Sequence, residues 1–401
     1  MPQSHSKIRG VKNPWKDFRD LTSDMARGTE LMKFLEAILQ DGKSVREACT
    51  DVFHSANANR KLVVDMFQAA HRVGFLTIQP YPVPQLRRRL MERFELEALE
   101  VVNVDTADEY GKYRFGRVAA RFLIERLNRH IGEGTGRKLV GLAAGNGQTV
   151  GLLAKGLKSF DDERNRAELE NAEYGNNPLA QWSKIHGRRL AVHTPTIGDH
   201  PDHIELSALE HLVDIARILR VPGAQRHLVS SSLPLPTSVD KRKELQKTEE
   251  IQNALRKIKQ NVRVVVFSPG AGKDNPCMNM MNKHSKGSPG AVGEILYNLY
   301  DENGEVIHAD RNPTLSLLPD GFLPQRLRES RAKAGEFDSI ALAAHFAPKK
   351  ESTQAKAKAV WAAIRNPRSR WCNALVCTAD IAKEILQIDD RDGASKQPPR
   401  R

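Results

Sequence analysis

The sequence predicts an α/β protein in which a small helical unit precedes a larger domain built on a parallel sheet. In residues 85–378, short apolar runs alternate with segments of helical apolar spacing, which is the order of a parallel sheet covered by helices. Residues 29–70 instead contain only short segments with helical spacing. Pro80, Pro82 and Pro84 lie between the two regions and predict a stiff, extended connector.

Composition indicates a globular protein with room for two or three domains. The chain has 401 residues, of which 40% are hydrophobic and 28% charged. No apolar run approaches the ~20 residues of a membrane span, and the N-terminus lacks the apolar core of a signal peptide. We therefore expect a cytoplasmic protein without a membrane partner. The four cysteines have no CxxC spacing, so we expect no metal site, no disulfide framework and no cofactor.

The net charge favours a polyanionic partner. Lys and Arg number 62 and Asp and Glu 49, which gives +13, and nucleic acid is the commonest polyanion for such a protein. Because the basic residues are spread along the chain, a merely soluble basic protein remains an alternative.

Three short helices are predicted at the start of the chain. In the first, from Thr29, residues Leu31, Phe34, Leu35 and Ile38 fall on one face. Ser44 and Glu47 form a capping box that predicts the start of the second helix. The third follows "SANAN", and its expected buried stripe consists of Val63, Met66, Phe67 and Ala70.

The third helix has the features of a DNA-reading element. Asn59 is its predicted N-cap, and Gly74 is expected to end it before a short strand, "FLTI". Three helices followed by a strand are the layout of a winged helix-turn-helix, whose third helix enters the major groove. A helical bundle for dimerisation or support is the alternative. The predicted DNA-binding residues are Asn59, Arg60, Lys61, Val64 and Gln68.

The elements of the larger domain are predicted from its alternation of short apolar runs and segments of helical spacing. Helices are expected over residues 85–94, 116–131 and 150–157, and strands over 100–104, 138–143, 226–230, 262–268, 339–346 and 374–378. The polar segment 160–177 is expected to be an exposed excursion.

A glycine-rich loop, "GNGQT" at residues 145–149, separates a predicted strand from a predicted helix. Such a loop can direct backbone N–H groups at an anion. It fits neither a dinucleotide loop, because Val150 replaces the third glycine, nor a Walker loop, because Gln148 replaces the lysine. Its position outside the carboxyl end of a strand, like that of "SPGAGKD" and the loop after "AAHF", favours a ligand site. An ordinary strand-to-helix turn is the alternative.

Several segments together resemble the SorC-type sugar-binding transcriptional regulators of bacteria. They are "QLRRRLMERFELEALEVVNV", the glycine loop with Thr149, "LPLPT", "GSPGAVGEILYNLYDENGEVI" and "ALVCTADIAKEIL", and the likeness runs from about Leu31 to Leu386. The resemblance implies a DNA-binding head and an effector domain related to sugar-phosphate isomerases and deaminases. It also implies a homodimer or homotetramer that binds operator DNA and responds to a phosphorylated sugar.

The resemblance also implies the ligand-binding residues. Glu294 would bind sugar hydroxyls, with an exposed strand-end acid as the alternative; Lys356 is the matching lysine, although Lys358 is an alternative alignment, and Lys273 is a second basic candidate. The effector's phosphate would lie on Gly145, Asn146, Gly147, Gln148 and Thr149.

The chain departs from the family pattern at two places. The family's "TDE" corresponds to Cys377, Thr378 and Ala379, which removes an acid from the neighbourhood of the pocket. Asp65 replaces an arginine in the recognition helix, so DNA binding is expected to be altered.

The leading interpretation is a regulator, not an enzyme, with no catalytic residues. Its predicted parts are an N-terminal arm (1–28), a helix-turn-helix domain (29–80), an effector domain (81–388) and a basic tail (389–401). The alternatives are an enzyme of the isomerase or deaminase class and a degenerate interaction module of the same fold.

Overall fold

The computed structural model describes most of the chain. The described residues are 25–39, 43–53, 60–72, 83–133, 139–170, 177–180, 182, 184–194, 207–228, 239–272, 275, 278–279, 290–307, 324–330, 336–346, 350–367 and 370–395. The chain divides into two compact units, Met1–Gln79 and Pro80–Arg401.

The first unit contains α1 (Met25–Leu39), α2 (Val45–Phe53) and α3 (Arg60–Arg72). Their core includes Leu31, Phe34, Ala48, Met66 and Ala70, all buried, and the Phe34 ring lies 5.9 Å from the rings of both Phe53 and Phe67. This burial confirms the predicted apolar faces of the first and third helices. α1 begins earlier than predicted, inside the expected arm.

The capping box of α2 is confirmed. The Ser44 N–H donates to Glu47 Oε2 at 2.7 Å, and the Glu47 N–H donates to Ser44 Oγ at 3.3 Å. These bonds satisfy two amides that a helix start would leave unpaired. Asn59, Gly74 and the predicted strand "FLTI" lie outside the described residues.

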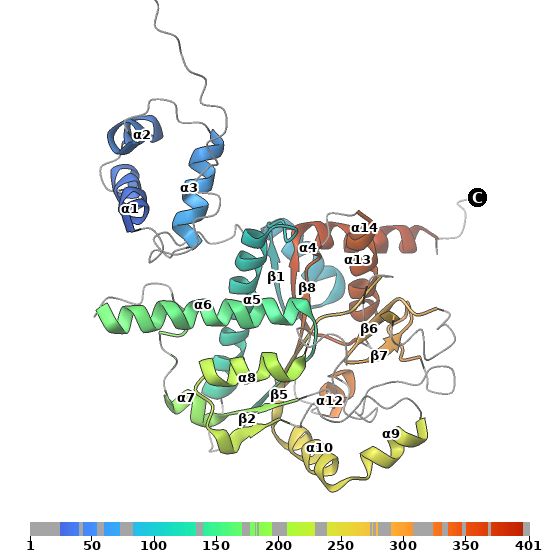
Figure 1. Ribbon diagram of the computed structural model, residues 1–401. Coiled ribbons are helices and arrows are strands. Elements are labelled where there is room, and N and C mark those ends of the chain that lie inside the picture. Colours follow the sequence, from blue (N-terminus) through green and yellow to red (C-terminus); the bar gives the residue numbers. More distant parts are fainter. Residues whose placement is uncertain are drawn as a thin grey trace, which may run out of the picture. The chain divides into compact units, whose positions relative to one another are not determined.

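The second unit is built on a parallel sheet (Figure 1). Within the described residues, its strands follow the order β1 (Ala98–Val102), β9 (Ala374–Thr378), β8 (Asp338–Ala343), β5 (Val262–Phe267), β2 (Val140–Ala144), β3 (Leu190–His193) and β4 (Arg226–His227). The chain runs outward from β2 to β4 and then returns to β5 on the other side of β2. The strand order therefore reverses between β2 and β5, which is where open α/β sheets bind ligands.

Helices cover both faces of the sheet. One face packs on α5 (Glu109–Glu133), α6 (Gln148–Glu170) and α8 (Ala208–Ile218). The other packs on α4 (Pro84–Phe94), α10 (Glu249–Asn261), α12 (Pro324–Ser330), α13 (Lys350–Arg365) and α14 (Ala379–Ser395). The structure also contains α7 (Lys184–Arg189), η2 (Gly223–Gln225), α9 (Val239–Gln246) and a hairpin of β6 (Gly293–Ile295) and β7 (Asn298–Tyr300). The predicted α/β fold with its parallel sheet is confirmed.

Glycines bring α5 and α6 into backbone contact. A Cβ at Gly116 would lie 2.3 Å from the Leu152 carbonyl oxygen, and one at Gly156 would lie 2.1 Å from the Gly116 carbonyl oxygen. Only glycine fits at such a crossing. The contact fixes α6 against α5, and thereby fixes the N-terminus of α6 above the sheet.

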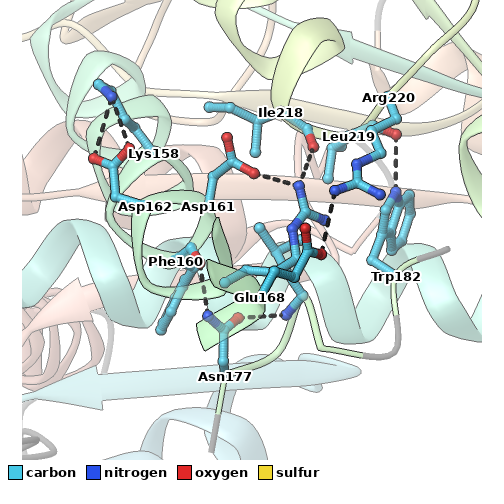
Figure 2. A network of polar contacts seen from close by, with 12 residues as sticks. Lys158, Phe160, Asp161, Asp162, Glu168, Asn177, Trp182, Ile218, Leu219 and Arg220 are labelled. Atoms are coloured by element: carbon cyan, nitrogen blue, oxygen red, sulfur yellow. Dashed lines mark hydrogen bonds and ion pairs between the residues drawn. The ribbon is translucent and has the colours of Figure 1, made fainter. Parts of the chain in front are cut away.

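The expectation that residues 160–177 form an exposed excursion is wrong for residues 160–170, because α6 continues to Glu170. Phe160 and Arg164 are buried within this extension. Two contacts order the extension. Arg164 pairs with Asp161, and Asn177 Nδ2 donates to the Phe160 carbonyl oxygen at 2.6 Å (Figure 2). The polar residues anchor the helix instead of breaking it.

Two other boundaries differ from the sequence prediction. Pro84 was expected to end an extended connector, but it is the first residue of α4. At this helix position its missing N–H costs no hydrogen bond. Pro80 and Pro82 lie outside the described residues. α14 runs to Ser395, into the expected tail.

A buried ion cluster joins α5 to the start of β8. Arg126 contacts both carboxylate oxygens of Asp338, and His130 Nε2 lies 2.8 Å from Asp338 Oδ2. Burial acts to raise the pKa of Asp338, but the bonds from His130 and Arg126 outweigh burial and lower it. The charged carboxylate is therefore the form that stabilises the fold.

We predict that Asp338→Asn lowers the free energy of unfolding by about 3 kcal/mol, because the partly buried Arg126 charge loses this carboxylate. Because the pKa of Asp338 is lowered in the folded state, the wild type loses this stabilisation as pH falls through that pKa. Urea denaturation measures both effects. Asp162→Asn removes the exposed pair with Lys158 (Figure 2) and serves as the control, with an expected loss below about 1 kcal/mol. Equal losses in the two variants would contradict the prediction.

Candidate functional site

The glycine loop connects β2 to α6 at the point where the strand order reverses. The Gly145 N–H donates to the Val266 carbonyl oxygen at 2.7 Å, so this amide is engaged by β5 and is not available to an anion. Gly147 has a φ of +107°, which glycine adopts readily, and α6 begins at the next residue, Gln148. The first amides of a long helix therefore follow the loop directly.

The side chains of the loop differ in exposure. Asn146 and Thr149 are buried, while Gln148 is exposed. Among the described residues, no protein group bonds the Thr149 hydroxyl, although the residue is 2% exposed. A Cβ at Gly147 would meet nothing within 4 Å, so the loop faces open space at that point. Helix amides, a hydroxyl and space beside them are what a phosphate group requires.

A strained hairpin turn packs against this loop. Leu296 and Tyr297, between β6 and β7, have φ values of 52° and 60°, a left-handed conformation that normally requires Gly, Asn or Asp. The Tyr297 N–H donates to Glu294 Oε1 at 2.7 Å, and Asn298 Nδ2 donates to the Leu296 carbonyl oxygen at 2.9 Å. The Leu296 side chain fills the space beside Gly145, where an added Cβ would lie 2.6 Å from Leu296 Cδ2.

Glu294 is held between the hairpin and the loop after β5. Glu294 and Gly270 exchange backbone hydrogen bonds of 2.7 and 3.0 Å. A Cβ at Gly270 would lie 2.4 Å from Glu294 Oε2, so the absent side chain makes room for the carboxylate. Because Glu294 is 3% exposed, the alternative of a solvent-facing strand-end acid is wrong.

Lys356 reaches the same loop from α13. Its Nζ donates to Ser268 Oγ at 2.9 Å and also contacts the Pro269 carbonyl oxygen. Lys358 is exposed, so Lys356 is the lysine that the helix directs to the site.

The two charged groups affect each other without touching. Burial raises the pKa of Glu294 to about 7, against the opposing effects of the Tyr297 N–H and of Lys356. Burial lowers the pKa of Lys356 to about 8, against the opposing effect of Glu294. Within the described residues, the two side chains form no direct ion pair. An acceptor and a donor are therefore held near each other, with their hydrogen-bonding capacity only partly used.

The remaining sequence candidates do not all fall within the described structure. Lys273 lies outside the described residues. Arg60 and Lys61 begin α3, but their side chains are not described. On the same helix, Val64 is 46% exposed and Gln68 is partly exposed.

The sequence analysis missed one polar group at this edge of the sheet. His345, just beyond β8, pairs with Asp380 of α14 at 3.3 Å between Nε2 and Oδ2. The loop after "AAHF" was expected at the carboxyl edge, but nothing in the sequence paired its histidine with an acid on another element.

Comparison with solved structures identifies the fold. The full-length sorbitol operon regulator SorC from Klebsiella pneumoniae superimposes with a TM-score of 0.51 at 15% identity, over 89% of this chain and 97% of that one. The chain has a SorC-like fold. A DeoR family transcriptional regulator from Listeria monocytogenes (TM-score 0.48, 17% identity, 76% and 99% coverage) and a transcriptional regulator from Streptococcus pneumoniae (0.48, 14%, 77% and 97%) are also similar.

The SorC-like fold confirms, at the level of structure, the resemblance seen in the sequence. No protein-family model and no curated protein matches the chain. Among the described helices, none has the length and apolar character to cross a membrane.

We predict that Glu294→Gln removes a pH-dependent loss of stability. The folded state raises the pKa of Glu294 from 4.5 to about 7, so it binds the proton more tightly than the unfolded chain does. Wild-type stability should therefore decrease from about pH 4.5 to 7. In urea denaturation, the stability of the variant relative to the wild type should rise over this interval. A difference that does not change with pH would contradict the prediction.

Proposed function

We propose that the protein is a DNA-binding transcriptional regulator whose activity is controlled by a phosphorylated sugar. The observation that carries the proposal is the grouping of the Thr149 hydroxyl, Lys356 and Glu294 at the strand-order reversal of a SorC-like fold. One solved protein with this fold is named as a sorbitol operon regulator.

The ligand follows from the donors and acceptors of the site. The N-terminus of α6 and the Thr149 hydroxyl offer hydrogen-bond donors to a phosphate. Lys356 adds a positive charge, and the Glu294 carboxylate accepts hydrogen bonds from sugar hydroxyls. Gly145 positions the loop through its bond to Val266. Asn146, Gly147 and Gln148 complete the proposed site, and Lys273 is an additional basic candidate.

DNA binding is assigned to the first unit. The proposed contacts to the major groove are Arg60 and Lys61 at the start of α3, Val64 and Gln68 on its outward face, and Asn59, which precedes Arg60 in the sequence. The net charge of +13 supports a polyanionic partner. We further propose that the protein is cytoplasmic and acts as a homodimer or homotetramer.

Regulation requires that the sugar bind two conformations with different affinities. The Leu296 side chain contacts the glycine loop, and the Tyr297 N–H bonds Glu294. The hairpin turn is therefore the element through which binding of the sugar can change the conformation of the domain. The chain could instead turn over a sugar phosphate, and this enzymatic alternative would require a base at the site.

We predict that Thr149→Val weakens binding of phosphorylated sugars about ten- to hundredfold, because it removes one hydrogen bond to a charged oxygen while preserving shape. Calorimetric titration of a panel of pentose and hexose phosphates tests this. Thr149→Ser keeps the hydroxyl and is the matched control, with near wild-type affinity. If no sugar phosphate binds the wild type, or if Thr149→Val binds equally well, the sensor proposal fails. Turnover that Glu294→Gln abolishes would favour the enzyme.

A second prediction concerns the proposed DNA contacts. Replacing both Arg60 and Lys61 with Ala should reduce the slope of log affinity against log salt by about two units, because two phosphate contacts are lost. Fluorescence anisotropy with a DNA duplex over a salt series measures the slope. Lys358→Ala with Lys383→Ala removes the same charge from exposed positions of the second unit and serves as control. An equal effect of both double variants would refute the assignment to α3.

A further inference from the structure

Most of the net charge lies outside the unit to which DNA binding is assigned. Residues 1–79 contain 12 Lys and Arg and 9 Asp and Glu, which gives +3. Because the whole chain carries +13, residues 80–401 carry +10. Like charges destabilise a compact state by mutual repulsion, whereas they attract a polyanion. The excess therefore favours a nucleic-acid contact in the second unit as well.

One face of α10 presents basic residues to solvent. The residues of α10 that pack in the core recur at helical spacing: Ile251, Ala254, Leu255 and Ile258. After Glu250, the exposed residues of the helix are basic or carry an amide: Gln252, Arg256, Lys257, Lys259 and Gln260. These five residues are called the outward face of α10.

The outward face of α10 lacks acidic neighbours. Other exposed helices pair a basic residue with an acid one turn away: Lys158 with Asp162 on α6, and Arg217 with Asp214 on α8. On α10, the positions three and four residues from Arg256 and Lys257 hold no acid, and neither residue forms an ion pair within the described part of the chain. The helix dipole favours a basic residue in the last turn, which accounts for Lys259 alone.

The positive charge of Lys257 also acts on two histidines beside α10. Its Nζ lies 3.2 Å from His227 Nδ1, and the ring centroids of His227 and His193 are 4.9 Å apart. Burial lowers the pKa of His227, and Lys257 lowers it further. Burial likewise lowers the pKa of His193 to about 3, with added effects of His227 and Lys257. No acidic side chain among the described residues opposes these effects on either ring, and a bound phosphate would supply the missing negative charge.

The composition of the outward face selects among anionic partners. It contains no aromatic or other large apolar side chain. The centre of a protein interface is usually built on such side chains, and a helix that lies in a membrane surface inserts them among the lipids. The apolar stripe of α10 is already buried in the core. Arg, Lys and Gln side chains donate hydrogen bonds to phosphate oxygens, so the face suits a nucleic-acid backbone.

We propose that the outward face of α10 binds the phosphate backbone of duplex DNA, in addition to the proposed contacts of α3. This second surface contributes affinity without reading the base sequence. The inference rests on the proposed function in one respect, which is the choice of DNA as the polyanion.

The test measures DNA affinity over a salt series for the full-length double variant Arg256→Gln with Lys257→Gln. Each lost phosphate contact reduces the slope of log affinity against log salt by about 0.9, so we expect a reduction of about two units. The reduction should be the same for duplexes of unrelated sequence. Arg256→Lys with Lys257→Arg preserves both charges and should keep the wild-type slope. Lys358→Gln with Lys383→Gln removes the same charge from exposed positions of other helices and should change the slope little.

The outcomes separate the two DNA contacts. If Arg256→Gln with Lys257→Gln keeps the wild-type slope while replacement of Arg60 and Lys61 lowers it, the second surface is refuted and the assignment to α3 stands. The reverse result supports the second surface and refutes the assignment to α3.

Three further outcomes would count against the second surface. An equal loss of slope in the control variant would refute it, because only the total charge would matter. Loss of binding to phosphatidylserine vesicles at an unchanged DNA slope would also refute it, because the partner would then be a membrane. If the wild type binds no DNA, both contacts fall together.

Discussion

The missing side chain of Gly145 is the constraint on which the candidate site depends. Its amide bonds the Val266 carbonyl oxygen, and the space beside its Cα is occupied by Leu296. The glycine loop, β5 and the hairpin therefore meet at one residue. A Cβ at this position would lie 2.6 Å from Leu296 Cδ2, so the Leu296 side chain would have to leave its place beside the loop.

The parallel sheet brings the residues of the candidate site together. Parallel strands bring all their carboxyl ends to one edge, so residues far apart in the sequence become neighbours there. Near β2 and β5, this edge offers helix amides, a hydroxyl and Lys356. Within the described residues, the buried Glu294 and the partly buried Lys356 form no direct ion pair. Their desolvation therefore costs stability, and such a cost is typical of residues kept for binding.

Much of the fold could be predicted from the sequence, because buried parallel strands are short apolar runs whose length distinguishes them from helices. The segment 374–378 was predicted with its observed bounds. β3 was missed because "LAVH" is short and follows basic residues that also suit a helix end. The extension of α6 was missed because Phe160 and Arg164 are buried by tertiary contacts that the local polar composition does not show.

The site was only partly predictable for a related reason. The glycine loop and Glu294 lie in short recognisable motifs, whereas the choice of Lys356 over Lys358 depends on which face of α13 meets Ser268. The pairing of His345 with Asp380 joins residues on different elements, and no local spacing encodes it.

The left-handed turn at Leu296 and Tyr297 has a consequence for how this protein can change over evolution. Glycine at either position would relieve backbone strain, yet it would also remove a side chain that is almost fully buried. Sequence drift at these positions is thus restricted from two sides. Substitutions that suit the backbone loosen the core, and substitutions that suit the core keep the strain. Laboratory selection for thermal tolerance alone would therefore meet opposing demands at this turn, because variants that relieve its backbone strain would loosen the packing of the hairpin against the glycine loop.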